Sequence, residues 1–194
     1  FMPNFANFSE LIRTGNLDFA LLKPIDTQFL ISCEKMELAM VNQIVLALSL
    51  LSYALYQIGE PVSFFQVVAY VTFLGVGVTF FYSLMIALAS ASVWMGRNQG
   101  LYDFWFYITV FARYPRSIYD GVDPDTLEAG EILQSAFTFI IPILLVVTVP
   151  AELIAKSMDS WNYPAIALGT SLAGLVVSRL FFNFALKRYR SASS

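Results

Sequence analysis

Long runs of uncharged, mostly apolar residues alternate along the chain with short charged segments. The runs cover residues 38–59, 61–96, 132–151 and 160–178. A helix needs about 20 apolar residues to cross the hydrocarbon core of a bilayer, so each run is long enough, or nearly so, for one span. The second run has room for two spans, but its only helix breakers are Gly75 and Gly77, with no polar turn residues beside them. It therefore favours one long span.

The pattern predicts an all-α membrane protein, a polytopic helical bundle with four transmembrane helices in a single domain, residues 1–194. The expected spans are 38–59, 63–92, 132–155 and 164–186. Residues 8–36 form a loop with a short amphipathic helix, and 187–194 form a short basic tail. Residues 97–131 form a loop that contains an aromatic stretch too short to span, which is typical of a helix lying in the membrane interface.

Composition agrees with this assignment and removes several classes of function. Hydrophobic residues make up 58% of the chain and charged residues 13%, whereas soluble domains carry about 25% charged residues. There is no histidine and one cysteine, Cys33, which excludes an intramolecular disulfide, a Cys/His zinc site and histidine acid–base catalysis. Neither a G-x-x-x-x-G-K-[ST] phosphate loop nor an H-E-x-x-H motif is present. We therefore expect no catalytic residue, no metal, no cofactor bound by this chain and no nucleic-acid partner.

Basic residues are concentrated on one side of the predicted spans. Of the 11 lysines and arginines, nine fall in the segments 1–37, 97–131 and 187–194, whereas the opposite connections hold only Lys156. Lysine and arginine collect in the cytoplasmic loops of membrane proteins. The long loops and the C-terminus are therefore expected in the cytoplasm.

Two prolines and one arginine stand out inside the predicted spans. Pro142 and Pro150 lie in the third span, where each bends the helix. Such kinks mark gates in some transporters, although prolines are also simply common in membrane helices. Arg179 precedes Lys187 by eight residues and so lies about 12 Å deeper in the membrane. It either snorkels to the cytoplasmic headgroups or is an intramembrane charge that faces a partner acid or the transport path.

The last span also carries small residues at four-residue spacing. Gly169 and Ala173 share one line of the helix, and Gly174 lies beside it. Small residues let membrane helices approach closely. The spacing predicts a packed interface, either within the subunit or across a dimer.

Three stretches of the sequence resemble the ABC-2-type transporter permease family, the membrane subunits of bacterial ABC exporters. The stretch "SELIRTGNLDFALLKPIDTQFLIS" is similar to the segment after the second span of these permeases, and the matching residues are Arg13, Gly15, Leu17, Asp18, Leu21, Leu22 and Pro24. The family usually has glutamate where this chain has Asp18. "FARYPRSIYDG" followed by "FTFIIPILLVVTVPAELI" resembles the subfamily with an ARYP-x-x-IY stretch, and "ALKRYRSASS" resembles its basic tail. The resemblance covers nearly the whole chain.

The resemblance implies a six-span permease in the bacterial plasma membrane, of which this chain holds the last four spans and the tail of the second. It implies pairing with a second copy or a sister permease, and separate ABC ATPase subunits that bind ATP and Mg. The loop after the second span carries the family's coupling helix, where Leu21 and Leu22 offer an apolar anchor between charged edges. The residues expected to contact the ATPase are Asp18, Leu21, Leu22, Lys23, Pro24, Tyr114, Pro115 and Arg116.

The leading interpretation is a permease subunit of an ATP-driven exporter, surrounded by membrane lipids, that moves an amphipathic, drug-like or lipid-like substrate outward. A membrane assembly or scaffold protein without transport is the alternative, because small-residue packing and interfacial helices serve it equally well. A third class is a secondary transporter or channel. It is disfavoured because ion-coupled carriers usually need acidic residues in mid-membrane, where this chain offers only Arg179.

Overall fold

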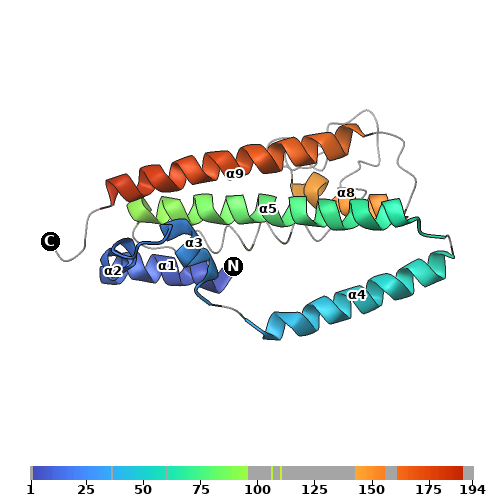
Figure 1. Ribbon diagram of the computed structural model, residues 1–194, viewed down its shortest axis with the longest axis horizontal. Coiled ribbons are helices and arrows are strands. Elements are labelled where there is room, and N and C mark those ends of the chain that lie inside the picture. The colour runs from blue at the N-terminus through green and yellow to red at the C-terminus, as the bar shows by residue number, and fades with distance from the viewer. Residues whose placement is uncertain are drawn as a thin grey trace, which may run out of the picture.

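The computed structural model of the protein describes residues 2–35, 37–59, 61–95, 106, 110, 143–155 and 161–189. Most of these residues are helical, and no strand occurs among them. In chain order the helices are α1 (Met2–Thr14), α2 (Leu17–Leu21), α3 (Thr27–Cys33), α4 (Ala39–Ile58), α5 (Phe64–Met95), α8 (Ile143–Ala155) and α9 (Asn162–Arg188) (Figure 1). Over this part of the chain the predicted all-α fold is confirmed.

Three of these helices, α4, α5 and α9, are long and apolar enough to cross a membrane. α5 runs as one continuous helix of 32 residues through the run predicted as a single span. α8 has 13 residues and belongs to the third predicted span, whose first part, 132–142, lies outside the described residues. A bundle of four spans therefore stays a prediction.

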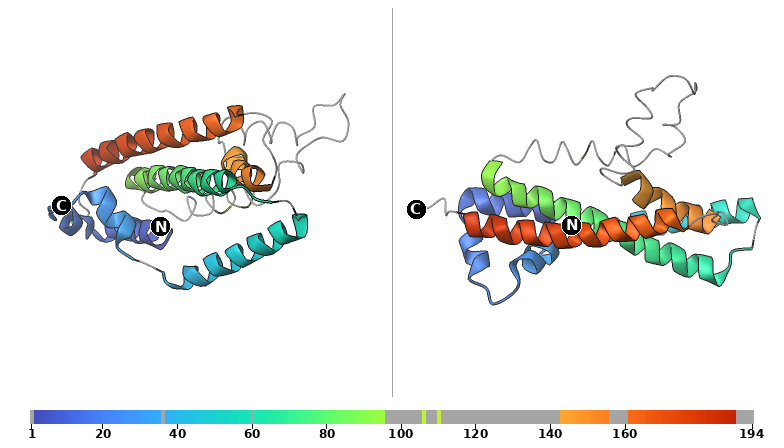
Figure 2. Two further views of the ribbon diagram at one scale, coloured as in Figure 1. Left: turned by 45° about the vertical axis from the view of Figure 1, so that its right-hand side comes forward. Right: turned by 90° about the horizontal axis from the view of Figure 1, so that it is seen from above.

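Helix α5 is the centre of the bundle. α9 lies along it, and α8 packs against both (Figures 1 and 2). The buried side chains between these helices are Ala69, Phe73, Phe80, Val146, Val149, Leu153 and Ala167. Glycine permits close approach at two points: a Cβ on Gly77 would lie 3.3 Å from Val146 Cγ1, and one on Gly174 would lie 3.2 Å from Ser83 Oγ. Close contact of this kind holds membrane helices together where lipid removes the hydrophobic drive.

Helices α1, α2 and α3 together form what we call the α1–α3 unit, which packs on the ends of α5 and α9 (Figure 2). Its shared core consists of Phe5, Phe8, Leu17, Ala20, Ile31, Met85, Ile86, Ala89 and Phe182. Phe8 is fully buried, and its ring centroid lies 5.8 Å from that of Phe182. The amide nitrogen of Asn4 donates to the carbonyl oxygens of Ser32 at 2.8 Å and Lys35 at 2.9 Å, which ties α1 to the end of α3.

Two glycines with positive φ turn the chain at the ends of helices. Gly15, with a φ of 73°, follows α1 and lets α2 begin two residues later. Gly59, also at 73°, ends α4, and its N–H donates to the carbonyl of Leu55 at 3.2 Å. Left-handed backbone costs little for glycine, which is why it is common just after a helix.

Helix α4 stands apart from the rest of the described structure (Figure 1). None of its residues is buried, and leucine, valine and isoleucine are exposed all along it. In a bilayer these side chains meet acyl chains that are as apolar as leucine, so their exposure is compatible with a spanning helix.

Candidate functional site

Helix α2 has apolar side chains on both of its faces. Leu17 and Ala20 are buried in the core of the α1–α3 unit, with 0% and 7% exposure. On the outside, Phe19 is 70% exposed and Leu22, the residue that ends the helix, is 80% exposed. Together with Leu21 and Ile25 these exposed side chains form what we call the α2 surface. The inner face fixes α2 to the unit, and the outer face is left available.

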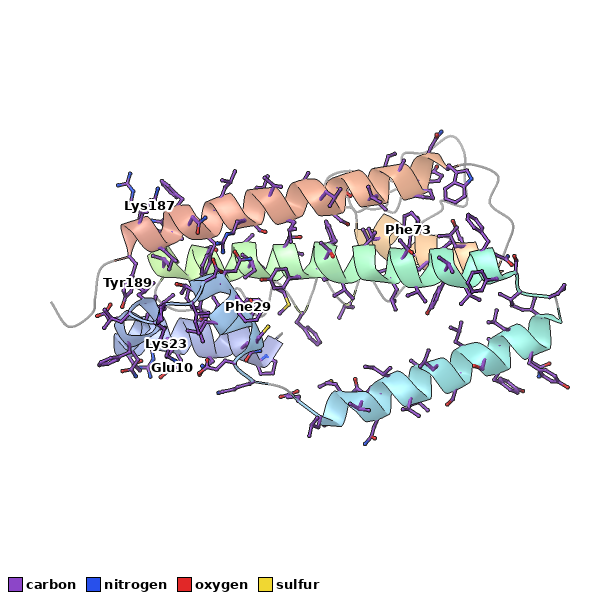
Figure 3. All side chains as sticks on the ribbon, in the orientation of Figure 1. Glu10, Lys23, Phe29, Phe73, Lys187 and Tyr189 are labelled. Carbon is purple, nitrogen blue, oxygen red and sulfur yellow. The ribbon has the colours of Figure 1, made fainter. Side chains whose placement is uncertain are left out.

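The α2 surface lies at the end of the bundle where α9 also ends. Lys23 follows Leu22 directly and lies at the same end of the molecule as Lys187 and Tyr189 (Figure 3). Asp18 is half-buried on α2, and Pro24 is exposed beyond it. The five loop residues predicted to contact an ATPase therefore occur together: Asp18, Leu21, Leu22, Lys23 and Pro24. The other three, Tyr114, Pro115 and Arg116, lie outside the described residues.

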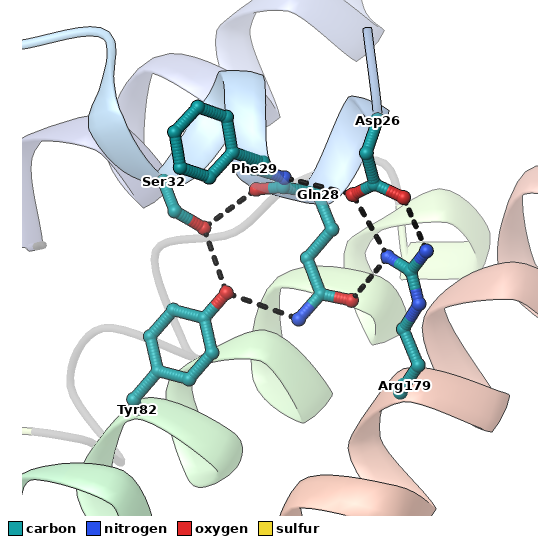
Figure 4. A network of polar contacts seen from close by, with 6 residues as sticks. All are labelled: Asp26, Gln28, Phe29, Ser32, Tyr82 and Arg179. Atoms are coloured by element: carbon teal, nitrogen blue, oxygen red, sulfur yellow. Dashed lines mark hydrogen bonds and ion pairs between the residues drawn. The ribbon is translucent and has the colours of Figure 1, made fainter.

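Asp26 directly precedes α3 and contacts two partners at once. Its Oδ1 accepts a hydrogen bond from the backbone N–H of Phe29 at 3.0 Å, which caps the helix. The same carboxylate pairs with Arg179 of α9, whose Nη1 donates to Oδ1 at 3.0 Å and whose Nη2 donates to Oδ2 (Figure 4). Two parallel contacts between a guanidinium and a carboxylate fix the direction as well as the strength of the interaction.

Further hydrogen bonds extend this pair to α5. Arg179 Nη1 also donates to Gln28 Oε1 at 2.8 Å, and Gln28 Nε2 donates to the Tyr82 hydroxyl at 3.0 Å. The Tyr82 hydroxyl lies 3.0 Å from Ser32 Oγ, which in turn donates to the backbone carbonyl of Gln28 at 2.6 Å (Figure 4). Gln28 and Ser32 are buried. The five side chains, which we call the Asp26 network, connect α3 with both α5 and α9.

The charged end of the network remains partly open. The side chains of Arg179 and Asp26 are 41% and 45% exposed. The hydrogen bond from Arg179 lowers the pKa of the Asp26 carboxyl below its ordinary value; partial burial opposes this, and the N–H of Phe29 adds to it. Asp26 is therefore ionised at neutral pH.

A cavity of about 410 Å³ adjoins the network. Its lining residues come from α3, α5 and α9 and from the residue before α3: Asp26, Gln28, Phe29, Tyr82, Leu175, Val176, Arg179 and Leu180. Polar groups line one part of this cavity, and leucine, valine and phenylalanine line the rest.

Sequence reasoning singled out Arg179 but not its partners. The guanidinium pairs with an acid, and that acid is Asp26, which lies before the first predicted span rather than inside one. Gln28 and Tyr82 were also missed. The sequence separations are 153 residues to Asp26 and 151 to Gln28, and no local pattern signals such a contact.

The residues expected to kink or pack the spans have separate positions. Pro150 is buried inside α8, whereas Pro142 lies outside the described residues. Gly174 faces Ser83 of α5, so it packs within the subunit. Gly169 has open space where a Cβ would stand, and Ala173 is exposed. The three small residues therefore do not share one interface in this chain.

The described residues contain a polar network that links three helices. No group of three or more His, Cys, Asp or Glu residues able to hold a metal ion occurs in the part of the chain that the structure describes. The Asp26 network joins three helices by charged and polar contacts, and the α2 surface lies on the same unit. The α2 surface and the Asp26 network therefore belong to one connected group of helices.

Comparison with known proteins identifies the chain. A family model described as "ABC-2 family transporter protein" matches residues 1–193. No curated protein and no solved structure gives a significant match. The match agrees with the three long apolar helices and with a membrane transport component that is not itself catalytic. The chain therefore belongs to the ABC-2 family of transporter proteins and is a multi-pass membrane protein of the permease type.

Proposed function

We propose that this chain is the permease half of an ATP-driven exporter and that separate ATPase subunits bind the α2 surface. One observation carries the proposal: Phe19 and Leu22 are 70% and 80% exposed, while Leu17 and Ala20 of the same helix are buried. An apolar patch next to charged groups is typical of a protein–protein contact site. Asp18 and Lys23 supply charges that select the partner and its orientation.

The energy source in this proposal is a second protein, which fits the lack of a phosphate loop in residues 1–194. ATP and Mg belong to the ATPase subunits. Nine of the 11 basic residues lie in segments on one side of the predicted spans, which supports a cytoplasmic position for the α1–α3 unit and for the C-terminus. In this proposal the protein lies in the bacterial inner membrane.

The Asp26 network supplies a route from the ATPase to the spans. Movement of the α1–α3 unit acts on Arg179 of α9 through Asp26 and on Tyr82 of α5 through Gln28. These contacts are short and partly buried, so the unit and the two helices move as connected bodies. We propose that closure of the ATPase subunits tilts α9 relative to the rest of the bundle, as in other transitions of packed helices.

A second permease, either another copy or a sister chain, completes the transporter in this proposal. Export of an amphipathic, drug-like or lipid-like substrate is supported by the apolar character of α4, α5 and α9. Pro142 and Pro150, in the third predicted span, are the proposed kinks at which that span bends during transport.

The alternative, a membrane scaffold without transport, predicts no ATPase partner. The deciding experiment expresses the permease with ABC ATPases encoded beside it and purifies the permease by an affinity tag. Co-purification of ATPase subunits in fixed ratio, lost on Leu22→Asp and kept on Asn16→Asp, supports the exporter. Asn16 is exposed and precedes α2, so this control adds the same charge without entering the α2 surface. A stable permease oligomer that never carries an ATPase supports the scaffold.

A further inference from the structure

The cavity beside the Asp26 network opens onto the outer flank of the bundle. Among the residues that line it, Phe29 is 63% exposed, Val176 59% and Leu180 64%. Leu172, one turn before Val176, is 54% exposed. Leu172, Val176 and Leu180 are spaced by four residues, so they form a stripe about 12 Å long on one side of α9. This apolar stripe leads to the charged part of the cavity.

The charged part lies within reach of the lipid headgroups. α9 has 27 residues and is about 40 Å long, which exceeds the hydrocarbon thickness of about 30 Å. Arg179 lies nine residues before the end of the helix at Arg188, about 14 Å from it. With all of this excess of about 10 Å on the side of Arg188, the backbone of Arg179 lies about 4 Å inside the hydrocarbon, within reach of the headgroups for a long side chain. Leu172 and Val176 lie deeper in the hydrocarbon, and Leu180 lies level with Arg179.

Arg179 keeps donors for a further acceptor. Of its five N–H groups, the two on Nη1 bond Asp26 and Gln28, and one on Nη2 bonds Asp26. Nε and the second N–H of Nη2 have no acceptor among the described residues. Asp26 is nearly half exposed beside them. The site therefore presents one cation and one anion next to each other, with no net charge.

We propose that this cavity binds a membrane phospholipid whose zwitterionic headgroup carries a primary ammonium, of the phosphatidylethanolamine type. The phosphate accepts hydrogen bonds from the free donors of Arg179, the ammonium donates to the Asp26 carboxylate, and one acyl chain lies along Leu172, Val176 and Leu180. An anionic headgroup without an ammonium is repelled by the Asp26 carboxylate. A choline headgroup has no N–H that could donate to this carboxylate. Asp26 and Arg179 together therefore favour a headgroup with a primary ammonium over these two headgroups.

This inference goes beyond the proposed function, because it needs only that α9 crosses a membrane. If no ATPase binds the α2 surface, the lipid proposal is unaffected. If no lipid binds the cavity, the proposed role of the α2 surface is unaffected. It assigns the cavity to a lipid rather than to a second copy of the chain, because the stripe is apolar where α9 meets acyl chains and the charged side chains lie within reach of the headgroups.

The test uses the full chain in nanodiscs of phosphatidylcholine that contain equal minor amounts of phosphatidylethanolamine and phosphatidylglycerol. Lipids retained after release are counted by native mass spectrometry. The wild-type protein is expected to retain phosphatidylethanolamine in preference to both others. Arg179→Gln is expected to lower that retention about tenfold, the effect of one lost charge-assisted contact. Val176→Trp fills the stripe without changing the ion pair and is expected to lower retention of phosphatidylethanolamine as much. This variant tests the proposal if Arg179→Gln does not fold.

The matched control is the double variant Glu10→Gln with Arg13→Gln. Glu10 and Arg13 form an exposed ion pair on α1, with contacts at 2.6 and 2.9 Å, and neither residue lines the cavity. Retention is expected to stay at the wild-type level there. Unchanged retention in Val176→Trp overturns the proposal, as does retention of phosphatidylglycerol equal to that of phosphatidylethanolamine. Cross-linking between two copies through Val176→Cys in a Cys33→Ser background also overturns the proposal, because it would show that the cavity lies in a dimer interface.

Discussion

Asp26 and Arg179, which are 153 residues apart in the sequence, form a two-contact ion pair between the residue before α3 and the C-terminal half of α9. The pair places the segment before the first predicted span in direct contact with the last one. Because α2 and α3 pack together in the α1–α3 unit, the exposed α2 surface and the charged contact belong to one body.

The ion pair is expected to contribute modestly to stability. Exposed pairs typically give about 0.2 to 1 kcal/mol, and the two-contact geometry places this one near the upper end. A double-mutant cycle with Asp26→Asn and Arg179→Gln, measured by unfolding in detergent, should return a coupling free energy of about 1 kcal/mol. Additive effects of the two changes would show that the side chains do not interact in solution.

The pH dependence of the pair follows from the lowered pKa of Asp26. Its ordinary value is 3.8, and in the folded protein the pKa is lower. The pair therefore stabilises the fold fully above the ordinary pKa, and this contribution is lost as the pH falls through the lowered folded value. The difference in unfolding midpoint between the wild-type protein and Asp26→Asn should be constant from pH 8 to about 5 and shrink in acid below about pH 4. A difference that changes between pH 8 and 6 contradicts this account.

Two glycines of α9 should respond differently to the same substitution. A Cβ at position 174 would lie 3.2 Å from Ser83 Oγ and 3.6 Å from Ser83 Cβ, so Gly174→Leu forces α9 away from α5 and should cost about 1 to 3 kcal/mol. Gly169 has nothing within 4 Å of its Cβ position. Gly169→Leu should be neutral or slightly stabilising, since glycine inside a helix costs about 0.5 to 1 kcal/mol. Equal losses of stability at the two positions would contradict the packing of Gly174 on Ser83.

The aromatic contact between α1 and α9 should anchor the α1–α3 unit. Phe8 is fully buried against Phe182, which is 1% exposed. Phe8→Ala leaves a cavity there and should lower the free energy of unfolding by about 3 to 5 kcal/mol. Phe64, at the start of α5, is 83% exposed, so Phe64→Ala is the matched control and should change stability little. Limited proteolysis should then cut the α1–α3 unit faster in Phe8→Ala only; equal cleavage of both variants contradicts the anchoring role.

The sequence was sufficient for the long helices and insufficient for the contacts between them. α4, α5 and α9 follow from uncharged runs, because length and apolarity are local properties. Arg179 attracted notice because a charge within a span is costly. Its partner was not predictable, since Asp26 reads locally only as the cap of a short helix.

The contacts of the small residues in α9 were also not predictable from the sequence. Their spacing predicted an interface, but spacing does not say which line of the helix faces a neighbour. The structure places Gly174 on Ser83 and leaves Gly169 open. Likewise, Leu17, Leu21 and Leu22 are alike in sequence, and only the packing of α2 shows that Leu17 is buried while Leu22 is 80% exposed. Burial depends on the path of the whole chain.

The most direct test of the central claim measures substrate export and permease-stimulated ATP hydrolysis in proteoliposomes that contain the permease and its ATPase subunits. Leu22→Asp should abolish export and return ATP hydrolysis to the level of the ATPase alone, because a buried carboxylate at the α2 surface cannot be accommodated in an apolar contact. Asn16→Asp, with the same added charge outside that surface, should keep both activities. Export and stimulated hydrolysis that both survive Leu22→Asp would contradict the assignment of α2 as the site where the ATPase binds.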